Sequence, residues 1–472
     1  MSKQETTDYR AYRSTFTKKA QQIVQKLSLE EKIYLMSGLR TMEEVRKSIQ
    51  KKVNTHYNEV PYRAGGIDGK VLPVLFADGT KGVVCDRKTY TCFPVESMRG
   101  ASFDPMLEKE IGEAIGAEVL LAGANLFGGV CVNLPYHPGW GRAQETFGED
   151  PYLLGEMGAA LVEGVQTTGV IACVKHFAGY GGATGGRDYN TVEVSENSFR
   201  NEYLPAYEKG IKAGAGMVMT SFNTVNGVPA TINQWLMKKV LREEMGFDGV
   251  LISDFAAIYE TIAHGCSEDA KDAAHKAALA GVDIDMMTEC YRSELVRLVE
   301  DGTIPEALID ESVLRILTLK NKLGLFEDPY KGMGAEKEAQ MQLTEAHRAL
   351  ARKAAAQTFV LLKNEGGLLP LSTEKKIAFI GPYTDSKCLI STWAISGDVK
   401  DCVTIREAAE EVFDSTKTTY VQGSAFMPQG YVFEGFDQAG NVLPVEYTEA
   451  ERTQMLQEAI EAAKQAEIVV MP

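Results

Sequence analysis

"GVLISDFAAIYE", residues 249–260, shows the pattern on which the fold depends. Residues 249–252 are apolar and Ser253 follows, which is typical of a strand that is buried on both faces. Asp254 comes next, and apolar residues then resume. A carboxylate in apolar surroundings is costly unless other groups compensate its charge. We therefore expect Asp254 to have a function, supported by polar groups from other parts of the chain.

Short apolar runs of this kind recur along the chain and alternate with helical patterns. The expected strands are 71–78, 128–134, 170–177, 215–222, 249–254 and 281–287. The expected helices lie at 105–123, 152–166, 195–214, 233–245, 267–280 and 293–302. Such alternation favours βα units with a parallel sheet. The fold class is therefore α/β, and an N-terminal (β/α)8-type TIM barrel, which usually needs about 250 residues, fits the length of this region.

The remainder of the chain predicts a second α/β domain. A helical pattern covers 344–364, an apolar strand follows at 377–382, and a helix at 451–466 leads into "EIVVMP" at 467–472. We divide the chain into an N-terminal extension (1–27), the barrel domain (28–325), a linker (326–343) and an α/β sandwich domain (344–472). Because the sequence stops on an apolar strand, we expect it to be a fragment whose second domain is incomplete.

Composition narrows the functional classes. The 472 residues carry a formal net charge of −16, from 49 basic and 65 acidic side chains. Nucleic acid and anionic membranes attract basic surfaces, so we expect neither as a partner. The eight cysteines form no C-x-x-C pair, and several lie in apolar runs, which favours free thiols in a reducing compartment. The polar N-terminus shows no secretory signal, so we expect a cytoplasmic protein; nothing in the sequence indicates an oligomeric state.

Polar residues follow most of the expected strands. They are Asp78, Asn133, Lys175 with His176, Ser221 with Asn223, Ser253 with Asp254, and Asp285. In a (β/α) barrel these strand ends converge on one mouth, where catalytic groups lie. The six histidines show no metal-binding spacing, and "GYGGATGG" at 179–186 lacks the pattern of a phosphate-binding loop. We therefore expect no metal and no cofactor.

Several long motifs together resemble glycoside hydrolase family 3, which contains β-glucosidases and related exo-acting enzymes. The resemblance covers nearly the whole chain from about residue 28, and its motifs occur in the order typical of the family. They are "LPVLFADGTKGV" (72–83), "GWGRAQETFGEDPYLLG" (139–155), "CVKHFAGYGGATGGRDYNTVEVSE" (173–196), "VMTSFNTVNGVPAT" (218–231), "LREEMGFDGVLISDFAAI" (241–258), "AGVDIDMM" (280–287) and "FVLLKNEGGLLPL" (359–371). The last of these, with 377–382, resembles the start of the family's flavodoxin-like second domain.

The resemblance implies a retaining exo-acting glycoside hydrolase that releases terminal β-linked glucose through a covalent glycosyl-aspartate intermediate. Its substrate would be a β-glucoside or a β-linked oligosaccharide. Asp254 would be the catalytic nucleophile. The sugar-binding positions that the resemblance implies are Asp78, Arg142, Lys175, His176, Met219 and Phe222. Three positions depart from the family pattern: Phe222 replaces a common tyrosine, Phe255 a tryptophan and Ala256 a glycine, which affects substrate preference rather than class.

A retaining mechanism also needs a second carboxyl group as general acid and base. In most of the family this glutamate follows a strand like 467–472, so we expect the general acid/base to be absent from this chain. Glu434 is the one substitute in the second domain, and nothing around it resembles the family's acid loop. Two alternatives stay open: a truncated, catalytically impaired sugar-binding fragment, and a metabolic (β/α) barrel with a nucleotide-binding second domain.

Overall fold

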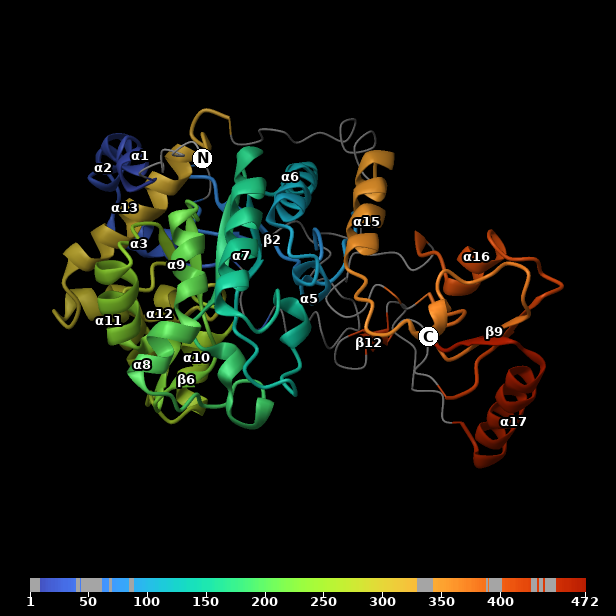
Figure 1. Cartoon of the computed structure of the whole chain (residues 1–472). Coiled ribbons are helices and arrows are strands. Elements are labelled where there is room, and N and C mark those ends of the chain that lie inside the picture. The colour runs from blue at the N-terminus through green and yellow to red at the C-terminus, as the bar shows by residue number, and fades with distance from the viewer. Residues whose placement is uncertain are drawn as a thin grey trace. The chain divides into compact units, whose positions relative to one another are not determined.

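The computed structural model describes residues 9–39, 43, 62–67, 70–84, 89–328, 343–387, 389, 401–425, 431–432, 436–437 and 447–472. The chain forms two compact units, Met1–Phe359 and Val360–Pro472 (Figure 1). Helix α15 (Glu345–Gln357) belongs to the first unit, whereas the sequence analysis began the second domain at residue 344. Its side chains explain this, because His347 Nδ1 lies 2.9 Å from Glu118 Oε1 and Lys353 pairs with Glu110.

The first unit is built on a six-stranded sheet in the order β1-β2-β3-β4-β5-β8. Strand β1 runs antiparallel to β2, and the other neighbouring strands are parallel. Strands β3, β4, β5 and β8 are buried along their whole length, as their apolar runs predict. The strands are β1 (Tyr62–Ala64), β2 (Val74–Ala77), β3 (Leu126–Cys131), β4 (Ile171–Phe177), β5 (Met217–Thr220) and β8 (Val250–Ile252).

Isolated bridges close this sheet into a barrel. Ile252 of β8 bridges to Ile284, Asp285 bridges to Ser37, and Gly38 bridges back to Ala64 of β1. The expected strand 281–287 is thus represented by bridges and not by a longer ladder. A Cβ atom at position 38 would lie 1.7 Å from the carbonyl oxygen of residue 286, so only glycine permits this approach. The expected TIM-barrel-like domain is confirmed, with β1 antiparallel as its main irregularity.

Helices form the outer layer of the first unit (Figure 1). Helices α6 and α7 lie side by side, and both begin with an aspartate N-cap and a proline in the first turn, as helix starts commonly do. The segment expected as a helix at 233–245 forms a π-helical stretch, Trp235–Glu244. The principal helices are α1 (Tyr9–Ser14), α2 (Thr17–Val24), α3 (Leu29–Leu35), α5 (Glu96–Gly100), α6 (Pro105–Leu121), α7 (Pro151–Thr167), α8 (Glu196–Ser198), α9 (Pro205–Lys212), α10 (Ala257–Ala263), α11 (Ala270–Ala280), α12 (Cys290–Glu300) and α13 (Glu306–Lys322). A small hairpin, β6 (Thr224–Val225) with β7 (Val228–Pro229), follows β5.

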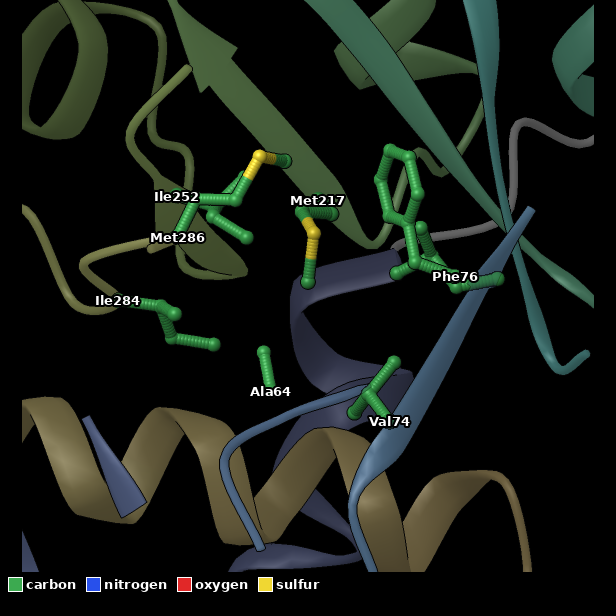
Figure 2. A pocket seen from close by; sticks show the side chains of 8 residues that line it. Ala64, Val74, Phe76, Met217, Ile252, Ile284 and Met286 are labelled. Carbon is green, nitrogen blue, oxygen red and sulfur yellow. The ribbon is translucent and has the colours of Figure 1, made fainter. Parts of the chain in front are cut away.

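The barrel interior is apolar. A cavity of about 10 Å³ lies there, and Figure 2 shows side chains from β1, β2, β5 and β8 converging on it. Its lining residues are Ala64, Val74, Phe76, Leu126, Met217, Ile252, Ile284 and Met286. A cavity this small holds one water at most, and an apolar lining offers that water no hydrogen bond. The interior is therefore packed core, and the chemistry must lie at the strand ends.

The start of α3 provides a test of the local structure. Ser28 and Glu31 form a capping box, in which the Ser28 Oγ accepts from the Glu31 N–H and the Glu31 carboxylate accepts from the Ser28 N–H. We expect Ser28→Ala to lower the free energy of unfolding by about 1 kcal/mol, because an N-cap acceptor is lost. Urea denaturation would measure this. Ser14→Ala, at an exposed serine at the end of α1, is the control and should change stability by less than about 0.5 kcal/mol.

The second unit contains a parallel sheet in the order β10-β9-β13. Its strands are β9 (Ile377–Ile380), β10 (Thr418–Val421) and β13 (Ile468–Val470), and its helices are α16 (Ile405–Glu410) and α17 (Glu449–Gln465). A hairpin pairs β11 (Tyr431–Val432) with β12 (Phe436–Asp437). The helix expected at 344–364 ends at Gln357 instead, where β-branched Thr358 and Val360 weaken helical propensity.

Two further features bear on the expectations from composition. Among the described residues, no helix combines the length and apolar character needed to cross a membrane. Six of the eight cysteines lie in the described part of the chain, where Cys131, Cys173, Cys266 and Cys290 are free thiols, whereas Cys85 and Cys388 lie outside it.

Candidate active site

Three strand ends bring their polar side chains together at one end of the barrel. Asp78 follows β2, Lys175 and His176 lie near the end of β4, and Asp254 follows β8. The Lys175 Nζ lies 2.7 Å from Asp78 Oδ1, and the His176 Nε2 lies 3.4 Å from Asp254 Oδ2. The structure therefore places four of the sequence-predicted site residues in one cluster.

Asp254 is held by its backbone and keeps one oxygen available. Its N–H lies 3.3 Å from Thr220 Oγ1, and its Oδ1 accepts a hydrogen bond of 2.7 Å from the Phe255 N–H. Within the described part of the chain, no donor makes a hydrogen bond to the buried Oδ2. Burial raises the pKa of Asp254 to about 6, although the charges of Arg142 and Lys175 and the Phe255 N–H act in the opposite direction. The carboxylate is thus ionised at neutral pH.

His176 is neutral, and its Nε2 lies 3.4 Å from Asp254 Oδ2 without the geometry of a hydrogen bond. Its Nδ1 lies 3.0 Å from the Nδ2 of Asn133, and the Oδ1 of Asn133 accepts from the His176 backbone N–H. Because an amide nitrogen can only donate, Nδ1 is the acceptor and the ring proton lies on Nε2, toward Asp254. Burial and then the charges of Arg142 and Lys175 hold the pKa of His176 well below its ordinary value. Asn133 is therefore the residue that fixes the tautomer.

Two ion pairs provide fixed charges around Asp254. Burial disfavours both charges of the Lys175–Asp78 pair, but their mutual attraction prevails: the pKa of Lys175 is raised and that of Asp78 is lowered. Arg142 donates two hydrogen bonds, of 2.9 and 2.8 Å, to the buried carboxylate of Glu145. A charged group makes a stronger hydrogen bond to a neutral partner than an uncharged group does.

Aromatic side chains line the site. Trp140, Tyr180 and Phe222 form a buried cluster with Ala257, and Phe255 packs against it. The Arg142 guanidinium lies 5.7 Å from the centre of the Tyr180 ring, which links the cluster to the charged groups. Phe222 thus lies in this cluster, and its role in substrate binding stays a prediction. Met219 is buried on β5 beside Ile252 of β8, and its role in substrate binding stays a prediction.

The other polar strand ends serve the fold. Ser253 Oγ accepts from the backbone N–H of residue 286, and Ser221 and Asn223 donate to the carbonyl oxygen of Ala178. Asp285 accepts from the Thr288 backbone and hydroxyl and from the backbone N–H of residue 291. These contacts stabilise the turns after the strands, so a polar strand end is a necessary but insufficient sign of a functional residue.

The sequence analysis missed three residues of the site. Glu145 binds Arg142 and lies three residues after it, a spacing that places both on one helical turn. Tyr180 is fully buried, and its hydroxyl has no hydrogen-bond partner among the described residues. Burial and the charge of Asp254 raise the pKa of Glu260, on α10, to about 7. Of these, only Glu145 has a local signal in the sequence.

The absence of the general acid/base from this chain stays a prediction, and Glu434 lies outside the described residues. The part of the chain that the structure describes contains no group of three or more His, Cys, Asp or Glu residues placed to hold a metal ion.

Comparison with known proteins assigns the chain to a family. The family model described as "Glycosyl hydrolase family 3 N terminal domain" matches residues 34–319, and that of the C-terminal domain matches residues 359–472. A periplasmic beta-glucosidase from Salmonella typhimurium is 36% identical, with 80% of this chain and 51% of that protein covered. Beta-glucosidase B from Emericella nidulans is 33% identical, with 76% and 39% covered. The chain thus spans about half the length, or less, of these curated relatives.

The architecture agrees with solved structures. A beta-glucosidase from Listeria innocua in complex with glucose is 34% identical, with a TM-score of 0.80, and the match covers 96% of this chain and 63% of that one. A mutant of the same enzyme in complex with laminaribiose has a TM-score of 0.81 at 34% identity, with the same shares covered. With a closed barrel, a cluster of polar groups at its strand ends and both family domains matched in order, the chain belongs to glycosyl hydrolase family 3.

Proposed function

We propose that the protein is a retaining exo-acting β-glucosidase and that Asp254 is its nucleophile. The observation that carries this proposal is the buried carboxylate of Asp254, which is ionised at neutral pH and has Oδ2 unoccupied by any described donor. A retaining glycosidase needs such a carboxylate to attack the anomeric carbon. The relatives named beta-glucosidase and the Listeria innocua complexes with glucose and laminaribiose support the same substrate class.

The proposed reaction has two steps. Oδ2 of Asp254 bonds to the anomeric carbon, the bond from that carbon to the aglycone oxygen breaks, and the departing oxygen takes up a proton from solvent. Water then attacks the same carbon and gives up a proton to solvent, the bond from that carbon to Oδ2 breaks, and glucose leaves with its β configuration as the carboxylate is restored. Lys175, Asp78, Arg142 and His176 would hold the sugar hydroxyls, since each presents a charged or oriented polar group to the site.

The stereochemistry of the product tests this proposal. Hydrolysis of an aryl β-glucoside, followed by proton NMR within the first minutes, should show β-glucose first and α-glucose only after mutarotation. α-Glucose as the first product would exclude a covalent intermediate on Asp254. The alternative, a sugar-binding chain without catalysis, predicts glucose binding and no hydrolysis.

The pH dependence follows from the pKa of Asp254. The nucleophile must be ionised, so activity is present above its pKa, which burial raises to about 6, and is lost as the pH falls through that value. We expect kcat/KM for an activated aryl glucoside at pH 5 to be about tenfold below its plateau. A profile of kcat/KM from pH 4 to 8 measures this. An acid limb centred near 4, the ordinary range of an aspartate, would contradict the assignment.

The proposed activity does not depend on the cellular compartment of the protein. The cytoplasmic location expected from the sequence stays a prediction, and the relative from Salmonella typhimurium is named periplasmic.

A further inference from the structure

The aromatic cluster beside Asp254 extends to one ring that the reaction as proposed does not use. Tyr189 exposes 40% of its surface, whereas Trp140, Tyr180 and Phe222 are buried. The Tyr189 ring lies 4.3 Å from that of Phe222, with 32° between their planes, and 6.3 Å from that of Tyr180. Tyr180 in turn lies 5.3 Å from the His176 ring. The rings thus lead from the buried polar cluster outward to an exposed tyrosine.

Tyr189 also lies close enough to Glu260 and Asp254 for their negative charges to act on its hydroxyl. Burial raises its pKa above the ordinary value, and the negative charges of Glu260 and Asp254 raise it further. Glu260 lies on α10, the helix that follows Asp254, and one of its carboxylate oxygens is buried with no partner among the described residues. Tyr189 therefore belongs to the same group of rings as Tyr180 and Phe222, and its hydroxyl stays uncharged at neutral pH.

The loop that carries Tyr189 is held in place before any ligand arrives. Asp188 accepts a hydrogen bond of 2.9 Å from the Trp140 Nε1, and the Thr184 N–H donates to the carbonyl oxygen of Thr191. Tyr189 itself has a φ of 65°, a left-handed conformation that is uncommon for a bulky residue and needs support from its surroundings. A side chain held in advance loses little conformational entropy when it binds.

We propose that Tyr189, stacked on Phe222, forms the floor of a subsite for the aglycone, and that this subsite favours aglycones with an extended apolar face over small alkyl groups. The proposal rests on the proposed function. The buried charged groups would bind the hydroxyls of the terminal sugar. The departing group must then point away from these charged groups, toward solvent. Tyr189 is the exposed member of the aromatic cluster, and its ring offers a face on which an aryl group or a second pyranose can stack.

Two variants and two substrates test the proposal on the intact protein. For phenyl β-glucoside we expect Tyr189→Ala to lower kcat/KM by about 5- to 10-fold and Tyr189→Phe, which keeps the ring, to stay within about twofold. For β-glucosyl fluoride, whose leaving group has no ring, both variants should stay within about twofold of the parent. Tyr12→Ala, at another exposed tyrosine on α1, should leave kcat/KM for both substrates unchanged.

The outcomes are distinguishable. Equal losses on both substrates, or no loss on phenyl β-glucoside, would overturn the aglycone subsite while leaving the glucosidase assignment intact. A parent protein that hydrolyses neither substrate would instead refute the proposed function, on which the subsite rests.

Discussion

Asp254→Asn should lower kcat by about 10⁴-fold or more, because the amide cannot form the glycosyl ester. The same change should stabilise the fold. The pKa of Asp254 is raised to about 6 by burial. Since one unit of pKa corresponds to about 1.4 kcal/mol, keeping this carboxylate ionised at pH 7 costs up to about 3 kcal/mol. We expect the variant to gain about 1–2 kcal/mol in free energy of unfolding at pH 7.

The size of this stability effect depends on pH. A carboxyl group whose pKa is higher in the folded state binds its proton more tightly there, so its stabilising contribution is present at low pH and is lost as the pH rises through about 6. The gain of the variant should therefore disappear below pH 4. Urea denaturation at pH 4 and pH 7, with aryl glucoside kinetics, measures both effects.

Asp285→Asn is a matched control for this prediction. Asp285 is also a buried aspartate after a barrel strand, but its oxygens accept hydrogen bonds from Thr288 and from the backbone N–H of residue 291. Replacement should lower the free energy of unfolding by about 1–3 kcal/mol, since a buried donor is left without its acceptor. An Asp254→Asn variant that retains activity, or that is destabilised like Asp285→Asn, would contradict the assignment of the nucleophile.

Lys175→Met should have the second largest effect. It leaves Asp78 without its partner at 2.7 Å, and we expect the free energy of unfolding to fall by about 2–4 kcal/mol. Loss of a charged hydrogen-bond donor should lower kcat/KM by about 10- to 100-fold. The charge of Lys175 also lowers the pKa of Asp254, so the acid limb of the pH profile should move above 6 in the variant.

Two further variants help to interpret the result for Lys175→Met. Asp78→Asn combined with Lys175→Met removes the unpaired charge and should recover part of the lost stability but not the activity. Lys353→Met breaks an exposed ion pair with Glu110 and should cost less than about 0.5 kcal/mol. If Lys175→Met left both the stability and the acid limb unchanged, the ion pair would not support the site as described.

The repeated pattern of strands and helices could be predicted from sequence because it depends on local periodicity. The strands around "VIACVKHF" and "GVLISD", the Ser28 capping box and the polar strand ends are all local features, and the structure contains each of them. The bridges that close the predicted barrel could not be foreseen, because they involve Gly38 and Asp285, which are far apart in sequence. The antiparallel direction of β1 likewise has no local signal.

The candidate site likewise combines features that could be predicted from the sequence with features that could not. Asp254, Lys175 and His176 were identified by their positions after strands and by the family resemblance, and the structure brings them together. The tautomer of His176 could not be predicted, because it depends on Asn133 at the end of another strand. Nor could the exposed position of Tyr189, which depends on Phe222 and on a loop anchored to Trp140. Such properties arise from contacts between strand ends and not from sequence patterns.

The most direct measurement concerns the bond to Asp254 itself. A fluorinated glucoside with an activated leaving group should form an ester that hydrolyses slowly enough to isolate, because fluorine beside the anomeric carbon destabilises the positive charge of the transition state. Peptide mass spectrometry after incubation should find one added fluoroglucosyl group, located on Asp254 and absent from Asp254→Asn. A label on another carboxylate, or an active protein that is never labelled, would contradict the account.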